Sequence, residues 1–223
     1  MSSKYAVLML ALAAAASAQK AAAQATVSFT SAGIRFDVPL PSGYCLPRGP
    51  FVEFAQQIAT ADVQNVTHLT LYRCDQQSGD RVVDYILIKT PRPALGTRIT
   101  REQLMADLGR EFAAIPAGGS LLSDESVDAI EGRIASALGR QLEMTGSVRP
   151  LGRDSVCAYL GGIFALTMAG GTHNVSAGAC VTSVAERIIT VNWYGADRGS
   201  AGVAALLARA RRLATLIRGR AAP

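Results

Sequence analysis

Apolar and polar residues alternate along several stretches of this chain, and this alternation predicts β-strands. Over residues 26–44 the apolar positions recur at every second residue, which predicts either a strand pair or one long bent strand. Two more strands are expected over 66–74 and 82–90, joined by a polar hairpin loop at 75–80. Residues 85–88 are apolar on both faces, so this strand is expected at the centre of a sheet covered on both sides.

The second half of the chain is rich in strand patterns from Gln141 onward. Four runs carry this pattern, namely 141–149, 155–168, 175–184 and 187–194. Short turns are expected between them at Leu151-Gly152-Arg153, at residues 170–174 and at Ala185-Glu186. Such short connections predict an antiparallel meander, in which consecutive strands are neighbours.

Helices are predicted where apolar residues recur at intervals of three and four. Pro50 suits the first position of a short helix, because its missing N–H has no intrahelical partner there. Thr100 and Gln103 form a capping box at the start of a second helix, which Pro116 ends. Ser123 is expected to cap a third helix that closes at Gly139.

The chain ends with a helix predicted over residues 200–218. Its apolar positions form one stripe, made of Val203, Leu206, Leu207, Ala210, Leu213, Ala214 and Ile217. Packing on the preceding meander is the preferred interpretation of this stripe, because one face of that sheet must be covered. The fold class expected is α+β: an antiparallel sheet sandwiched by helices, in a single domain over 26–223, with the C-terminal helix packed on the sheet.

The first 25 residues have the pattern of a cleaved signal peptide. Lys4 precedes an apolar run of eleven residues, and small-residue cleavage sites follow at 16–18 and 23–25. The run is shorter than the roughly 20 residues that a membrane-spanning helix needs. We therefore expect export to the periplasm or the exterior as a soluble product.

The charge balance is only weakly basic. The whole chain has a net charge of +5, and loss of Lys4 and Lys20 with the leader lowers it to about +3. A nucleic-acid-binding domain usually carries a much denser basic patch, so nucleic acid is not an expected partner. The arginines of the C-terminal helix keep a further hypothesis open, in which this helix lies on an anionic membrane surface.

Four cysteines remain after the leader: Cys45, Cys74, Cys157 and Cys180. An even number in an exported chain predicts disulfides, and four cysteines allow three pairings. We prefer the most local pairing, Cys45–Cys74 with Cys157–Cys180, where each bond contributes about 3 kcal/mol by loop closure. A simple hairpin does not place Cys157 directly opposite Cys180. The rival interpretation is a metal site that includes His68 or His173, although the spacings match no zinc pattern.

Candidate functional residues are few. Trp193 and Tyr194 end the last predicted strand and are pocket candidates, because aromatic pairs often line ligand clefts. His68 and His173 are the two histidines that could act as a general base. Neither a nucleophile elbow nor a phosphate-binding loop accompanies them, so we expect no catalytic residue, no cofactor and no resident metal.

Two segments resemble a known superfamily. Phe36-Asp37-Val38-Pro39-Leu40-Pro41-Ser42-Gly43-Tyr44 is similar to the entry strand and turn of the PsbP-like superfamily. Ile188-Ile189-Thr190-Val191-Asn192-Trp193-Tyr194 and the helix after it resemble that superfamily's last strand and closing helix. The group includes plant photosystem extrinsic proteins and bacterial periplasmic relatives of the DcrB type. The resemblance implies a sheet sandwiched between helices, and it carries no catalytic residues over, because the superfamily mostly binds or scaffolds.

Three functions are compatible with these patterns. The first is an exported non-enzymatic protein that binds an envelope partner or a small ligand, or supports the cell envelope. The second is an exported hydrolase whose site has no recognised motif. The third is a peripheral membrane-surface protein that uses the basic C-terminal helix.

Overall fold

Ten strands and four α-helices form the part of the chain that the computed structural model describes, residues 25–77, 84–116, 118–121, 123–139, 141–168 and 170–222. Nearly all of the predicted signal peptide, residues 1–24, lies outside these ranges. The helices are α1 (Pro50–Ala61), α2 (Arg101–Ala114), α3 (Asp124–Leu138) and α4 (Gly199–Leu216). The strands are β1 (Thr26–Ser31), β2 (Ile34–Pro39), β3 (Tyr44–Cys45), β4 (Asn65–Arg73), β5 (Tyr85–Pro91), β6 (Glu143–Arg153), β7 (Ala158–Met168), β8 (Gly171–Val184), β9 (Arg187–Ala196) and β10 (Arg218–Ala221).

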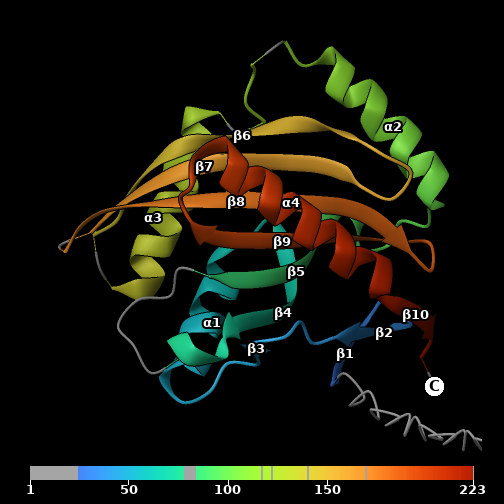
Figure 1. Cartoon of the computed structure of the whole chain (residues 1–223), viewed down its shortest axis with the longest axis horizontal. Helices are drawn as coiled ribbons and strands as arrows, with labels where there is room; N and C mark the ends of the chain where they lie inside the picture. Colours follow the sequence, from blue (N-terminus) through green and yellow to red (C-terminus); the bar gives the residue numbers. More distant parts are fainter. Residues whose placement is uncertain are drawn as a thin grey trace, which may run out of the picture.

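Seven strands form one antiparallel sheet in the order β3-β4-β5-β9-β8-β7-β6 (Figure 1). The strands β6 to β9 are consecutive neighbours, so the predicted meander is confirmed. The strand β5 lies inside the sheet between β4 and β9, and Ile86, Leu87 and Ile88 on it are buried. The apolar run at 85–88 therefore marks an inner strand, as expected.

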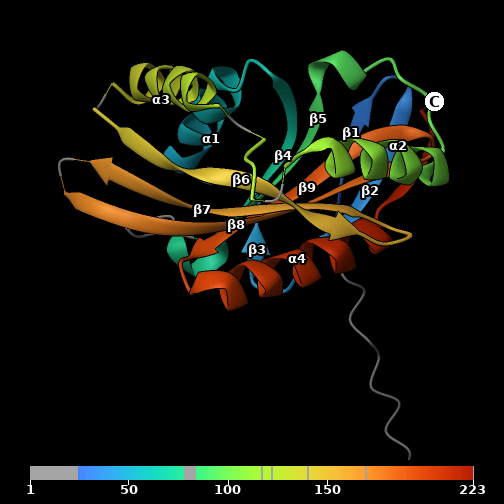
Figure 2. The same ribbon diagram turned by 90° about the horizontal axis from the view of Figure 1, so that it is seen from above.

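Helices cover both faces of this sheet. Figure 2 shows α4 on one side, and α1, α2 and α3 on the other. The buried residues of α4 are Val203, Leu206, Ala210, Leu213 and Ala214. Leu206, Ala210, Leu213 and Ala214 belong to the main hydrophobic core, together with Ile86, Ile88 and Val191 of the sheet. The predicted α+β class, with helices on both sides and the C-terminal helix packed on the sheet, is confirmed.

The helix α4 approaches the sheet closely because glycine lies beneath it. A Cβ atom added at Gly178 of β8 would lie 2.9 Å from the backbone nitrogen of Leu207 and 3.0 Å from Cβ of Leu206. At Gly161 of β7 it would lie 2.7 Å from Cγ1 of Val203. These distances leave no room for a side chain, so glycine at both positions sets how near α4 packs to the sheet.

The caps predicted for the helices are present. Thr100 accepts a hydrogen bond from the Gln103 backbone, and the Gln103 side chain accepts one from the Thr100 backbone, which is a complete capping box. Ser123 accepts a hydrogen bond from the Ser126 backbone at the start of α3. Gly139 closes α3 in the left-handed conformation, with φ of 59°.

A second, three-stranded sheet was not predicted. It has the order β1-β2-β10, and it confirms a strand pair rather than one bent strand at the start of the chain. The predicted C-terminal helix ends earlier than expected, because Ile217 is extended and buried. Residues Arg218–Ala221 then pair with Ile34–Asp37 of β2. Arg-Gly-Arg-Ala has no apolar alternation, so hydrophobic periodicity could not reveal this strand.

One predicted turn is wrong, and another is shorter than predicted. The turn expected at residues 151–153 belongs to the irregular end of β6, and the chain reverses at 154–157 instead. There Asp154 accepts hydrogen bonds from the backbone N–H groups of Val156 and Cys157 at 2.7 and 2.8 Å, which is an Asx-type turn. Residues 171–174 lie within β8 rather than in a turn. The turn at Ala185-Glu186 is confirmed, with φ of 50° and 59°.

Both predicted disulfides are present. Cys45–Cys74 links β3 to the short 3-10 helix η1 (Cys74–Gln76) that follows β4, and Cys157–Cys180 links the start of β7 to β8. Cys180 lies opposite Tyr159, so Cys157 is two residues away on the same face. This diagonal placement, with Cα atoms 5.1 Å apart, explains how residues that are not directly opposite can be bonded.

Candidate functional site

The two adjacent aromatic residues at the end of β9 point to opposite faces of the sheet. Successive side chains of a strand alternate between faces, so Trp193 and Tyr194 cannot line one pocket together. Trp193 belongs to the core beneath α4, whereas Tyr194 stacks on Tyr85 across the sheet from it. The predicted pocket pair is therefore separated by the thickness of the sheet.

Trp193 is held inside the protein by specific contacts. Trp193 is only 5% exposed. Its indole N–H donates to the Tyr44 hydroxyl at 2.9 Å and to the Asp84 carboxylate at 3.1 Å. The Tyr44 ring packs edge-on against the indole at 5.1 Å, and its hydroxyl donates to Asp84. Burial, followed by the hydrogen bond to Asp84, raises the pKa of Tyr44 above its ordinary value. These contacts tie β9, through Trp193, to β3 at the edge of the sheet.

Tyr194 is one end of an aromatic row on the other face. The ring centre of Phe51 on α1 lies 5.6 Å from that of Tyr72, which lies 6.1 Å from that of Tyr85. The rings of Tyr85 and Tyr194 are stacked, with their centres 4.5 Å apart. Tyr72 is opposite Tyr85 in the register of β4 and β5, and Tyr85 is opposite Tyr194 in that of β5 and β9. Cross-strand aromatic pairs of this kind each contribute about 0.5–1.5 kcal/mol beyond their buried area.

The three tyrosines of this row differ in exposure: Tyr72 is only 2% exposed, whereas Tyr85 and Tyr194 are half-buried. Among the described residues, none makes a hydrogen bond to the hydroxyl of Tyr72, Tyr85 or Tyr194. Burial raises the pKa of Tyr72 to about 12 and that of Tyr85 well above its ordinary value, so both hydroxyls keep their protons at neutral pH. A protonated phenol can donate one hydrogen bond and accept another.

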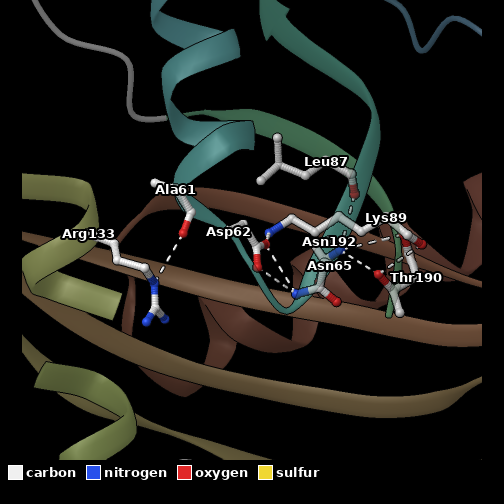
Figure 3. Close-up of polar contacts among 8 residues, drawn as sticks. All are labelled: Ala61, Asp62, Asn65, Leu87, Lys89, Arg133, Thr190 and Asn192. Carbon is white, nitrogen blue, oxygen red and sulfur yellow. Dashed lines mark hydrogen bonds and ion pairs between the residues drawn. The ribbon is translucent and has the colours of Figure 1, made fainter. Parts of the chain in front are cut away.

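Lys89 provides a charged group on the same face of the sheet as Tyr85, because it lies two residues beyond Leu87 on β5. Its ammonium donates to Asp62 at 2.6 Å, and the Asn65 amide donates to both oxygens of Asp62 at 2.9 and 3.1 Å (Figure 3). Asp62 follows the last residue of α1 and Asn65 begins β4, so the tight connection between them presents both side chains to the sheet. The Lys89 and Asp62 side chains are only 13% and 20% exposed.

Burial and charge act in opposite directions on this pair. Burial alone raises the pKa of Asp62, but the Lys89 ammonium and the Asn65 amide outweigh it, so the pKa is lowered. Burial alone lowers the pKa of Lys89, but Tyr194 and the Asp62 carboxylate outweigh it, so the pKa is raised. Both shifts favour the charged forms, and the pair is ionised at neutral pH.

A hydrogen-bonded group on β9 borders the ion pair. The Asn192 amide donates to the Thr190 hydroxyl at 2.9 Å and to the Leu87 carbonyl at 3.2 Å (Figure 3). Thr190 in turn donates to the Lys89 carbonyl at 3.4 Å. We name the set Tyr72, Tyr85, Tyr194, Lys89, Asp62, Asn65, Thr190 and Asn192 the tyrosine–lysine layer. It combines an apolar ring surface with a few fixed polar groups, which is the composition of many ligand sites.

His68 is placed where it cannot act as a base toward its neighbour. Its Nε2 lies 2.9 Å from the Thr90 hydroxyl, and Thr90 donates its own proton to the Ile188 carbonyl at 3.0 Å. The Thr90 hydroxyl therefore accepts a hydrogen bond from His68, and the imidazole proton lies on Nε2. The imidazole also stacks on Phe29 at 4.5 Å, and burial lowers its pKa, so the neutral ring is favoured.

His173 and the other predicted pocket residues are dispersed over the molecule. His173 is half-buried on β8 opposite Leu166. A shallow hollow of about 450 Å³ lies between α1 and α3, and a second of about 800 Å³ lies between α2 and the turn after β6. None of Trp193, Tyr194, His68 and His173 lines either hollow. Their role in a pocket stays a prediction.

Within the described residues, no three His, Cys, Asp or Glu side chains are grouped as a metal site would need. No helix of the described part is both long and apolar enough to cross a bilayer.

Sequence reasoning missed most of the tyrosine–lysine layer. It placed Tyr85 on a central strand but did not connect it to Tyr72, because hydrophobic periodicity does not fix which residues of two strands lie opposite each other. The usable clue was Lys89, the one lysine of the sequence after residue 25. A charge on a predicted central strand requires a partner, since an unpaired buried ammonium is strongly destabilising.

Comparisons with known proteins add little to this picture. No protein-family model and no curated protein matches the sequence. The structure is similar to the solution structure of cyanobacterial PsbP (CyanoP) from Synechocystis sp. PCC 6803, with a TM-score of 0.36 and 13% sequence identity, over 91% of this chain and 96% of that chain. The resemblance to bacterial DcrB-type proteins stays a prediction.

Proposed function

We propose that this chain is an exported, disulfide-stabilised protein that binds an envelope partner or a small ligand, or supports the envelope, without a catalytic step of its own. The observation that carries the proposal is the pairing of all four cysteines that follow the leader. Disulfides persist in oxidising compartments and are rare in the reducing cytosol. Cys157 and Cys180 are fully buried, so this bond is part of the folded core.

The tyrosine–lysine layer is the binding surface in this proposal. The hydroxyls of Tyr85 and Tyr194, which have no hydrogen-bond partner among the described residues, can donate to a polar ligand, and the stacked rings of these two tyrosines offer it an apolar wall. The Lys89 and Asp62 charges are already matched to each other. The layer therefore suits a neutral or weakly polar ligand with an aromatic or aliphatic part better than a multiply charged one.

Export is tested by intact mass and non-reducing peptide mapping of the protein recovered from its native compartment. The expected result is a chain that has lost the leader and contains Cys45–Cys74 and Cys157–Cys180. A retained leader with four free thiols would contradict the proposal.

Binding is tested by thermal-shift screening of small neutral compounds against the wild type, Tyr194→Phe and Tyr159→Phe. Tyr159 lies on the other face, where its hydroxyl donates to Asp154 at 2.7 Å, so it is a matched control. A compound that stabilises the wild type and Tyr159→Phe, but not Tyr194→Phe, is the expected result. Equal shifts for all three proteins would remove the layer from the proposal.

A further inference from the structure

The C-terminal part of the chain concentrates positive charge. Residues 198–222 contain six arginines and no acidic residue: Arg198, Arg209, Arg211, Arg212, Arg218 and Arg220. All six are exposed. Arg198, Arg209, Arg211 and Arg212 lie at the N-terminal end of α4 and along it, and we call this surface the arginine face, whereas Arg218 and Arg220 lie on β10 in the smaller sheet. The chain as a whole has a net charge of only +5, so the rest of it is nearly balanced.

The opposite side of the sheet has the opposite charge. The helices α1 and α3 lie across the sheet from α4 (Figure 2). Glu53 is the only charged residue of α1, and on α3 Glu125, Asp128 and Glu131 outnumber Arg133. The charges are therefore separated across the thickness of the protein, which gives the molecule an electrostatic direction.

Internal contacts neutralise only part of the arginine face. Arg211 pairs with Asp154 at 2.6 Å, and outside this face Arg220 of β10 shares Asp37 with Arg35 at 3.2 Å each. Among the described residues, Arg198, Arg209 and Arg212 form no ion pair, although Arg209 lies 5.8 Å from the centre of the Trp193 ring. The surface stays positive after these pairs are counted.

The exposed side of α4 carries small side chains, and the apolar stripe of this helix packs inside the protein. Ala201, Ala205 and Ala208 are exposed on the outer row of the helix, so a flat partner can approach the arginines without steric hindrance. Val203, Leu206 and Leu213 are buried in the protein and cannot enter a bilayer unless α4 leaves the sheet. Any attraction to a membrane is therefore electrostatic and confined to the headgroup level.

We propose that the arginine face docks the folded protein on an anionic lipid bilayer, with the acidic α1–α3 side turned away from it. Arginines spread along an exposed helix match a flat surface of repeated negative charge better than they match a single bound anion. The inference rests on the proposed export, because an exported protein meets the outer or periplasmic surface of a membrane. Lipid binding is measured on the purified protein. A negative binding result is therefore distinguishable from a negative result of the non-reducing peptide mapping, which tests export.

The test is co-sedimentation of the purified full chain with vesicles of phosphatidylcholine, with and without phosphatidylglycerol. Binding is expected only to the anionic vesicles at low ionic strength, and it should disappear in about 1 M salt, where the Debye length is about 3 Å. The variant R198Q/R209Q/R212Q removes the three arginines without an ion pair. It should bind about 100-fold more weakly, since each basic residue near an anionic surface contributes about fivefold.

The matched control is R92Q/R98Q/R110Q, which removes the same charge from exposed arginines before and within α2. It should bind as the wild type does, and circular dichroism confirms that both variants are folded. Equal loss in the two variants would show that net charge matters rather than the arginine face, and would overturn the proposal. Absence of wild-type binding at low salt would do the same. Self-association by light scattering that the arginine-face variant abolishes would assign the surface to a second copy of the chain instead.

Discussion

The buried ion pair between Lys89 and Asp62 leads to a quantitative prediction. Lys89→Met keeps an unbranched side chain of similar length and removes the ammonium. It leaves Asp62 with the Asn65 amide as its remaining side-chain partner, 2.9 and 3.1 Å from its two oxygens. The carboxylate is then a largely buried charge without an opposite charge, which is the costly half of a broken pair.

The size of the effect follows from burial. Breaking a fully buried ion pair costs about 3–5 kcal/mol, whereas an exposed pair contributes about 0–1 kcal/mol. The Lys89 and Asp62 side chains are 13% and 20% exposed, so solvent screens the remaining charge to some extent. We expect a loss of about 2 kcal/mol in the free energy of unfolding at neutral pH. The double variant K89M/D62N, which buries no charge at this position, should recover most of that loss.

The loss should depend on pH in a defined direction. In the wild type the pKa of Asp62 is lowered below its ordinary value of 3.8, so its stabilising contribution is present above that value and is lost as the pH falls through the folded-state pKa. In Lys89→Met the ammonium is gone and burial raises the Asp62 pKa instead. The difference between the two proteins should therefore be largest at neutral pH and should shrink as the solution is acidified.

Urea unfolding followed by tryptophan fluorescence measures this difference, because Trp193 is the only tryptophan in the chain and is buried. Arg110→Met is the control, since its pair with Asp107 has side chains 74% and 50% exposed and should contribute little. A loss for Lys89→Met no larger than that of the control would refute the reasoning. So would a loss that stays constant from neutral to acid pH.

Three further outcomes follow from packing and exposure. Gly178→Ala should lower the free energy of unfolding by about 1–3 kcal/mol, because its Cβ would lie 2.9 Å from the backbone of α4. Gly132→Ala on α3 is the control in the same urea assay. It should be neutral or slightly stabilising, because no atom lies within 4 Å of its Cβ. Mild dithiol treatment of the native protein should open Cys45–Cys74, where Cys74 is exposed, before the fully buried Cys157–Cys180, and alkylation with mass spectrometry reads the order. Glu131→Ala should promote aggregation measured by light scattering, because the Glu131 carboxylate accepts the Met144 N–H at 2.7 Å on the edge strand β6.

Local patterns predicted most of the elements because their determinants are close in sequence. The capping box at Thr100 and Gln103 and the left-handed cap at Gly139 each depend on a few neighbouring residues. The apolar runs around Ile86 and Val191 identified the sheet for the same reason, since a buried strand is marked by its own side chains. Preference for the local disulfide pairing was also correct, because strand neighbours in a meander are close in sequence.

The features that escaped prediction depend on distant residues. β10 exists because Arg218–Ala221 meets β2, almost two hundred residues earlier, and nothing in Arg-Gly-Arg-Ala announces a strand. The turn at Asp154 was misplaced because a glycine at 152 is a stronger turn marker than an aspartate whose role depends on its side-chain hydrogen bonds. The partner of Lys89 lies on the connection after α1, so only the register of β4 against β5 brings the two together.

The pairing of β10 with β2 also constrains when this protein can finish folding. The hairpin β1–β2 is local in sequence, but the third strand of its sheet lies more than 180 residues further along the chain. Contacts of such long sequence separation form late, because the entropy of closing so large a loop is lost before the contact stabilises the chain. A truncated product would keep the hairpin with one edge of β2 open to other strands. The smaller sheet thus stays incomplete, and this edge of β2 unpaired, until Arg218–Ala221 have docked.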